Sequence, residues 1–213
     1  MCKIIVMANQ KGGVAKTSST RNLAYSLAEL GKKVLAVDFD PQTNLTISFG
    51  VAPAALQETA ASLMMKLVMD EVLPEKASYI LNIGKVDLLP SKKTLTVAEV
   101  NLLIERKDDC LAKLLAPLRA DYDYILVDTG PSLGSLTINA FTAADEIIIP
   151  VDPELFALVG LKELTETISK IKQNLNPKVE IIGILFTKCS KRTTLYRQTS
   201  EQVRSVFGLS LIH

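Results

Sequence analysis

A short glycine-bearing loop between an apolar run and a helical pattern constrains this chain more than any other feature. The loop and the start of the helix run from Gln10 to Ser18 (QKGGVAKTS), and residues 4–8 (IIVMA) form the apolar run. A strand, such a loop and a helix in succession point backbone N–H groups at an anion, and the helix dipole favours negative charge there. The sequence therefore predicts a phosphate cradle.

The two lysines of the loop have different expected roles. Lys16 is placed to reach the β- and γ-phosphates of a bound nucleotide, and the Thr17 hydroxyl to ligate Mg²⁺. Lys11 is not required for cradling phosphate and needs a separate explanation. The expected nucleotide-binding residues are Lys11, Gly12, Gly13, Val14, Ala15, Lys16, Thr17 and Ser18.

Strand and helix patterns alternate along the chain. Expected strands are 3–8, 33–39, 86–90, 122–128, 146–151 and 179–188, and expected helices are 17–30, 56–72, one or two within 96–118, 133–144, 155–175 and 195–207. The alternation predicts an α/β fold with a doubly wound, mostly parallel sheet and helices on both faces. We expect residues 1–213 to form a single domain.

Composition narrows the function classes. Hydrophobic residues make up 48% and charged residues 22% of the chain, as in ordinary globular proteins. A net charge of +1 means that nucleic-acid binding would depend on a local patch. Cys2, Cys110 and Cys189 are widely separated, which favours reduced thiols and a cytoplasmic location. The apolar runs are too short to span a membrane.

Two further segments place acidic residues at the carboxyl ends of expected strands, where ligands bind in open α/β sheets. They are 37–42 (VDFDPQ) and 126–132 (LVDTGPS). A charge at the end of an apolar strand is costly unless it meets a cation. We expect Asp128 to organise Mg²⁺ through water, Asp38 to support the outer shell of the metal, and Asp40 to position an attacking water. Taken singly, each Asp is equally compatible with a helix N-cap.

Together, the three segments resemble the deviant Walker A ATPases of the ParA type, which partition plasmids and chromosomes and include MinD and the nitrogenase iron protein. KGGVAKTS is similar to the KGGVGKT[ST] of that family, VDFDPQ to its second acidic motif, and ILVDTGPSLG to its Walker B segment and switch. The resemblance covers essentially the whole chain. It implies the P-loop NTPase fold, ATP and Mg²⁺ as cofactors, slow ATP hydrolysis and a ParB-like stimulating partner.

The resemblance also explains Lys11. It implies an ATP-dependent homodimer in which Lys11 reaches across to the ATP phosphates of the partner, as a transition-state cation supplied in trans. The catalytic set is then Lys11, Lys16 and Asp40. Gly12 is expected at the dimer seam, where a side chain would clash.

The chain departs from the family pattern in three places. Ala15 stands where most relatives have Gly, and it is expected to strain the loop without abolishing binding. Gly130 stands where the family often has Pro, which is expected to loosen the switch. The sequence ends at His213, so the final strand, adenine-contacting loop and C-terminal helix of the family are expected to be missing.

Positive charge concentrates in and before the last expected helix. The residues are Lys188, Lys191, Arg192, Arg197 and Arg204. In ParA relatives, basic residues of this region contact DNA without sequence preference, and Arg192 matches their R-T-x-L segment. The resemblance thus implies non-specific DNA binding by Lys188, Lys191, Arg192 and Arg197, on the nucleoid or on plasmids, by phosphate neutralisation. The alternative is a solvated helix face.

Three rival functions remain. A MinD-like membrane-cycling ATPase needs a C-terminal amphipathic helix, which is absent before His213, so no membrane partner is expected. A redox ATPase needs cluster-ligating cysteines near the switch, and Cys110 and Cys189 do not sit beside Asp128. A non-hydrolysing regulatory or binding module is favoured by Ala15 and by the short C-terminus.

Overall fold

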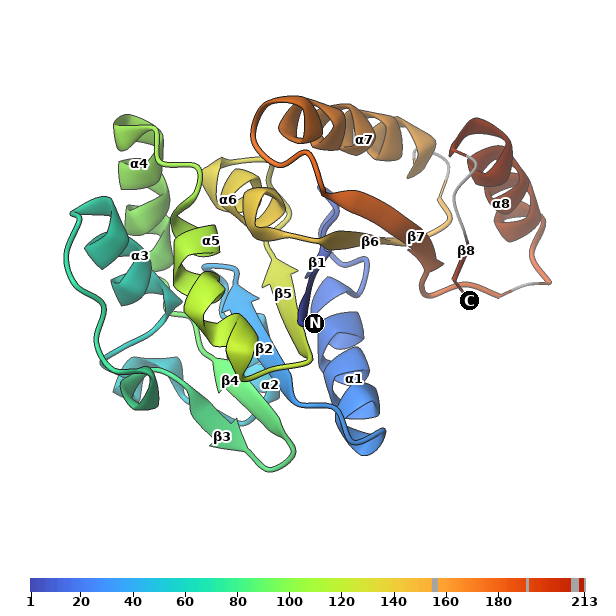
Figure 1. The fold of residues 1–213 in the computed structure, drawn as a ribbon. Helices are drawn as coiled ribbons and strands as arrows, with labels where there is room; N and C mark the ends of the chain where they lie inside the picture. Colours follow the sequence, from blue (N-terminus) through green and yellow to red (C-terminus); the bar gives the residue numbers. More distant parts are fainter. Residues whose placement is uncertain (155–156, 191, 208–210, 213) are drawn as a thin grey trace.

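The computed structural model describes residues 1–154, 157–190, 192–207 and 211–212, and these contain one eight-stranded sheet (Figure 1). The strands are β1 (Lys3–Met7), β2 (Val34–Phe39), β3 (Leu81–Ile83), β4 (Val86–Leu89), β5 (Tyr124–Thr129), β6 (Glu146–Val151), β7 (Glu180–Phe186) and β8 (Leu211–Ile212). Their order across the sheet is β3-β4-β2-β5-β1-β6-β7-β8. Every neighbouring pair is parallel except β3 with β4.

Helices cover both faces of this sheet. They are α1 (Lys16–Glu29), α2 (Asn44–Ser48), α3 (Ala60–Val68), α4 (Leu95–Glu105), α5 (Cys110–Leu115), α6 (Ser135–Ala143), α7 (Ala157–Asn174) and α8 (Thr194–Phe207), with short 3₁₀ turns at Pro53–Ala55, Lys76–Ser78 and Ala116–Ala120. Side chains of α1 and α2 pack on one face of the sheet, and side chains of α3 to α8 pack on the other. The doubly wound α/β fold is confirmed.

Strand β1 marks the point where the winding of the sheet reverses. Ile4 and Val6 join the hydrophobic core on one face, while Ile5 and Met7 join the core on the other. The helix after β1 covers the face opposite to the helix after β5, the neighbour of β1. In such sheets, a crevice opens at the carboxyl ends of the strands beside the reversal. The loop after β1 therefore leads into this crevice.

The expected elements agree with the structure in kind and differ at some ends. The helix expected over 56–72 is shorter, because α3 begins after Thr59, whose N–H donates to Ser62 Oγ at 2.8 Å, and is over before Asp70, which has a left-handed φ of 54°. The expected start of α7 at Leu155 lies outside the described residues. The helix α2 and the strands β3 and β8 were not predicted, because two to five residues are too few to show a period.

Within the described ranges, none of the helices combines the length and the apolar character needed to cross a lipid bilayer.

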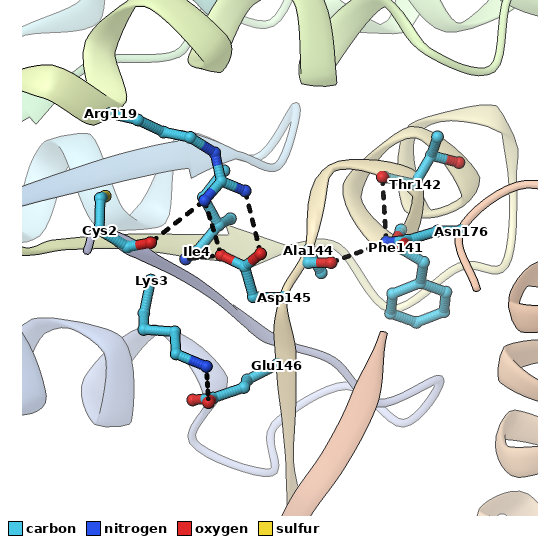
Figure 2. A network of polar contacts seen from close by, with 10 residues as sticks. All are labelled: Cys2, Lys3, Ile4, Arg119, Phe141, Thr142, Ala144, Asp145, Glu146 and Asn176. Atoms are coloured by element: carbon cyan, nitrogen blue, oxygen red, sulfur yellow. Dashed lines mark hydrogen bonds and ion pairs between the residues drawn. The ribbon is translucent and has the colours of Figure 1, made fainter. Parts of the chain in front are cut away.

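A polar network joins β1 and β6 at their amino ends, opposite the crevice (Figure 2). The Arg119 guanidinium donates to both oxygens of Asp145, at 2.9 and 3.1 Å, and to the Cys2 carbonyl at 3.1 Å. The same Asp145 carboxylate accepts the Ile4 N–H at 2.7 Å. A bidentate Arg–carboxylate pair has a fixed geometry. It therefore sets the register with which β1 enters the sheet, and hence where the loop after β1 begins.

Asn176 closes the end of α6 in the same network (Figure 2). Its side-chain amide donates to the carbonyls of Phe141, Thr142 and Ala144, at 2.9, 3.1 and 2.7 Å. The last carbonyls of a helix lack partners within the helix. Asn176 therefore supplies these bonds from the loop that precedes β7.

We predict that Asn176→Ala lowers the free energy of unfolding by about 1–2 kcal/mol, because half-buried carbonyls lose their donor. Asn174→Ala is the matched control: Asn174 is exposed and its amide bonds only the Lys170 carbonyl of its own helix. That control should change stability by less than about 0.5 kcal/mol. Urea unfolding monitored by circular dichroism compares the two variants, and equal losses would contradict the capping role.

Candidate functional site

The loop between β1 and α1 leaves a helix N-terminus open. Gly13 has φ 75°, and Ala15, directly before α1, lies in the left-handed region at φ 63° and ψ 30°. Among the described residues, no side chain caps α1, and its first turn carries no acidic residue. The first N–H groups of α1 and the positive end of its dipole are thus available to an anion.

The Lys16 side chain lies inside this loop. Its ammonium donates to the carbonyls of Asn9 and Lys11, at 2.9 and 3.1 Å, and only 7% of the residue is exposed. Burial lowers the pKa of Lys16, while the charges of Asp128 and Asp40 oppose that shift. Lys16 is therefore a desolvated cation at the centre of the loop, where an anionic ligand would offset the cost of its burial.

Asp128 is fully buried at the end of β5 and meets α1 through hydroxyl groups. The Thr17 hydroxyl donates to Asp128 Oδ2 at 2.6 Å, and the Thr20 hydroxyl lies 3.4 Å from Oδ1. Burial, together with the charges of the nearby Asp38 and Asp40, raises the pKa of Asp128 to about 7, although the Thr17 hydrogen bond opposes the shift. A divalent cation beside Asp128 would favour its charged form and reverse this shift.

Asp38 lies opposite Asp128 in the register of β2 and β5, and is also fully buried. The Thr46 N–H and hydroxyl both donate to Asp38 Oδ2, at 2.8 and 2.5 Å, and the Asp40 N–H lies 3.3 Å from Oδ1. Burial raises the pKa of Asp38 to about 6, although these hydrogen bonds lower it. These hydrogen bonds therefore fix the Asp38 carboxylate in its position beside the site.

Asp40 lies just beyond β2, with 7% of the residue exposed. Its Oδ1 accepts the Gln42 N–H at 2.9 Å. A Cβ atom on Gly130 would lie 3.3 Å from this same Oδ1, which is a tight contact. The glycine at 130 thus makes room for the Asp40 carboxylate, a physical role that the sequence comparison with proline did not suggest.

These segments meet around one cavity of about 490 Å³. Its lining residues are Gly12, Gly13, Ala15, Lys16, Thr17, Ser18, Asp40, Gln42, Asn44, Thr129, Pro131 and Lys188. The volume is within the range of small-molecule sites. The fold therefore brings the three sequence segments together. Val14 is buried in the loop, and its carbonyl accepts a hydrogen bond from the Thr187 hydroxyl at 3.0 Å.

Lys11 points away from Lys16. Its ammonium pairs with Glu154 of the same chain, and the two side chains are 47% and 53% exposed. This pairing holds the pKa of Glu154 below its usual range. Lys11 lines a separate cavity of about 250 Å³ beside Asp152 and Gly160. The two lysines of the loop thus face different surroundings.

The predicted DNA contacts do not all lie together. Arg192, just before α8, is exposed, and so are Arg197 and Arg204, which are about two turns apart along α8. None of these three arginines has an acidic partner within 4 Å in the part of the chain that is described. Lys188 instead lines the cavity beside the phosphate loop, and Lys191 lies outside the described residues. We call Arg192, Arg197 and Arg204 the basic patch.

The residues around the cavity fit a magnesium nucleotide. Hydroxyl and carboxylate oxygens are the ligands that Mg²⁺ prefers, and it takes several more from water and phosphate. Thr17 and Asp128 supply such oxygens, with Asp38 behind them. The described residues contain no cluster of three acidic, histidine or cysteine side chains that could hold a metal alone. A metal here would therefore depend on the phosphates of the ligand.

Several residues of the site were not predicted. Thr46 holds Asp38, Thr187 joins the end of β7 to the loop, and Glu154 pairs with Lys11. Each is distant in sequence from the residue it contacts or belongs to no motif. Only the fold brings these residues to the site.

Comparison with known proteins places the site in context. Residues 2–181 match a family model described as an AAA domain. The chain is 39% identical over 208 residues to the sporulation initiation inhibitor protein Soj of Bacillus subtilis, covering 97% of this chain and 81% of Soj. It is 38% identical to the chromosome partitioning protein ParA of Myxococcus xanthus, covering 96% and 71%. An uncharacterized protein of Mycobacterium tuberculosis is 41% identical, and the chain spans 64% of its length.

Solved structures are also similar to this chain. The structure of cobyrinic acid a,c-diamide synthase from Mycobacterium smegmatis with bound ADP and magnesium has a TM-score of 0.91 and 34% identity, covering 100% of this chain and 85% of that one. A plasmid partition protein from Borrelia burgdorferi has a TM-score of 0.81 and 29% identity, covering 98% and 88%. A similar protein with this fold thus binds ADP together with magnesium.

We predict that Ala15→Gly raises the free energy of unfolding by about 0.5–1 kcal/mol. The left-handed conformation costs a residue with a Cβ about 1–2 kcal/mol, and the extra freedom of glycine in the unfolded chain returns part of the gain. Ala112→Gly, within α5, is the control and should lose about 1 kcal/mol. Thermal and urea unfolding compare the variants; a loss at both positions would mean that Ala15 is not strained.

Proposed function

Because the chain belongs to the ParA/Soj family of P-loop partitioning ATPases, we propose that it dimerises on Mg-ATP, binds DNA without sequence preference and hydrolyses ATP slowly. A ParB-like protein stimulates hydrolysis and so releases the dimer. ATP then acts as a timer in the segregation of plasmids or chromosomes, and the protein associates with the nucleoid or with plasmids in the cytoplasm.

One observation carries the proposal: the phosphate loop, Lys16 and Asp40 line one cavity, and two fully buried carboxylates lie next to its lining. Asp128 accepts a hydrogen bond from the lining residue Thr17, and Asp38 is opposite Asp128 in the strand register. Lys16 is desolvated and positive, while burial raises the pKa values of Asp38 and Asp128 toward neutrality. An anionic nucleotide offsets the first cost, and its magnesium ion offsets the second. Both halves of Mg-ATP are thus needed to balance the charges of this site.

The residues of the cavity divide the work of phosphoryl transfer. Lys16 and the N–H groups at the start of α1 bind the phosphates. Asp40 orients a water molecule whose oxygen attacks the γ-phosphorus while the bond to the β–γ bridging oxygen breaks, giving ADP, phosphate and a proton. Thr17 and Asp128, with Asp38 beside Asp128, would hold a magnesium ion, which would neutralise charge on the phosphates.

The environment of the loop supports a dimer. Within the described residues, nothing lies within 4 Å of a Cβ atom built on Gly12, so one chain alone gives no steric reason for this glycine. Lys11 does not line the 490 Å³ cavity of its own chain and pairs instead with Glu154. Both features agree with a second copy of the chain packing against this surface and receiving Lys11.

We predict that Lys11 acts in trans. Lys11→Ala should leave ATP binding by the monomer nearly unchanged and lower turnover, by up to roughly 10³-fold where a trans cation stabilises the transition state. Asp40→Ala should bind ATP and accumulate as a dimer without turnover. A 1:1 mixture of the two variants should recover roughly a quarter of wild-type turnover, since half of the dimers are mixed and each has one complete site.

Calorimetry measures ATP binding, size exclusion measures dimerisation, and phosphate release measures turnover. Gly12→Ala is a further variant, which should lose dimerisation although it keeps every charge. Mixed dimers without recovered turnover would exclude action in trans. ATP binding and dimerisation without turnover in the wild-type protein would instead favour a non-hydrolysing regulatory module.

DNA binding is proposed for the basic patch together with Lys191. The arginines of the patch are exposed, and no acidic side chain described in the structure neutralises them within 4 Å. Guanidinium groups of this kind bind phosphate oxygens well. Binding of DNA then depends on charge and weakens steeply with salt.

We predict that Lys191→Glu with Arg192→Glu weakens binding to DNA of all sequences alike and flattens the log–log salt dependence by about 2 units, because two phosphate contacts are lost. ATP binding should not change. Fluorescence anisotropy with two unrelated duplexes, titrated at several salt concentrations, measures both effects. A slope equal to that of the wild type would identify these residues as a solvated face.

A further inference from the structure

Lys188 lies over the phosphate loop, although it comes from the other half of the sequence. It lines the 490 Å³ cavity together with Gly12, Gly13 and Lys16. Its ammonium nitrogen is 3.9 Å from the position of a Cβ atom on Gly13. The ammonium is therefore near the backbone of the phosphate loop. Gly13 has no side chain that would cover this backbone.

The end of β7 fixes this placement. The Thr187 N–H donates to the Val151 carbonyl at 2.9 Å, and the Thr187 hydroxyl donates to the Val14 carbonyl at 3.0 Å. Thr187 thus binds both the neighbouring strand and the phosphate loop. Lys188 is the next residue, so these bonds also hold it beside the phosphate loop.

The backbone of Lys188 is itself unusual. Its φ of 52° lies in the left-handed region, which favours glycine and asparagine over lysine. Backbone outliers of this kind cluster at binding sites, where the surrounding structure maintains them. The conformation directs the chain from β7 toward α8 at the edge of the cavity.

The charge of Lys188 has no local partner. No carboxylate of the described residues lies within 4 Å of its ammonium. From a longer distance, the positive charge of Lys188 is one of the causes that lower the pKa of Glu154. Lys16 is engaged with loop carbonyls, and Lys11 is paired. Of the two lysines described in the lining of this cavity, Lys188 is the one whose ammonium no hydrogen bond or ion pair of the described residues engages.

We propose that Lys188 is a third phosphate-binding lysine, which contacts the polyphosphate of a nucleoside triphosphate from the side opposite to Lys16. This rests on the proposed nucleotide binding and replaces DNA contact as the role of Lys188. An ammonium recognises phosphate charge and not the base. Lys188 therefore contributes more to the binding of ATP than of ADP, and equally to ATP and GTP.

The test is calorimetry with Mg-ATP and Mg-ADP on Lys188→Gln, which removes the charge and keeps a polar side chain that is one atom shorter. The ATP dissociation constant should rise about tenfold, and the ADP constant by less, because one charge-assisted contact to a more highly charged ligand is lost. Lys188→Arg should stay close to the wild type. Lys178→Gln is the matched control, since Lys178 is exposed at the other end of β7 and should have no effect.

Lys188→Gly separates binding from folding. It removes the ammonium and relieves the left-handed backbone, so it should weaken ATP binding while it raises the thermal midpoint. ATP affinity unchanged in Lys188→Gln, with weaker DNA binding by the ATP-bound protein, would overturn the assignment and restore DNA contact. Absence of ATP binding in the wild-type protein would overturn the proposed function and this assignment together.

Discussion

Two buried carboxylates on neighbouring strands are the constraint on which the site depends. Asp38 and Asp128 stand side by side in the register of β2 and β5, and neither is exposed to solvent. Burial is the main cause that raises their pKa values to about 6 and about 7, and the charge of Asp38 adds to the shift of Asp128. Hydroxyl donors from Thr17 and Thr46 offset part of the cost of burial. A cation completes the balance, so the fold holds a site that favours metal-bound anions.

The sequence predicted the parts of this protein that repeat a physical rule. Apolar runs at regular spacing identified the central strands, and strand β2, buried along its whole length, is typical of them. The loop and the two acidic segments were recognisable because phosphate and metal chemistry require fixed residue types at strand ends. The elements missed were short or at the edge: α2, β3 and β8 depend on their neighbours and carry no period of their own.

Orientation was the part that the sequence could not predict. Lys11 and Lys16 are five residues apart, yet one pairs with Glu154 at the surface and the other is buried among carbonyls. Lys188 looked like a member of a basic run toward the C-terminus, but the bonds of Thr187 hold it beside the phosphate loop. For Lys11 and Lys188, the contacts that decide this join residues more than a hundred positions apart, which no local pattern contains.

The three lysines differ most in how firmly each is held. Lys16 is buried and bonded twice, so its position is set before any ligand arrives. Lys11 is held only by an ion pair between two half-exposed side chains, and such pairs are weak because water competes for both charges. In the proposed dimer, exchanging Glu154 for the phosphates of a nucleotide bound to the second chain would therefore cost little, and the stronger charge of a triphosphate would favour the exchange. A cation that is held weakly in its own chain is suited to act in another.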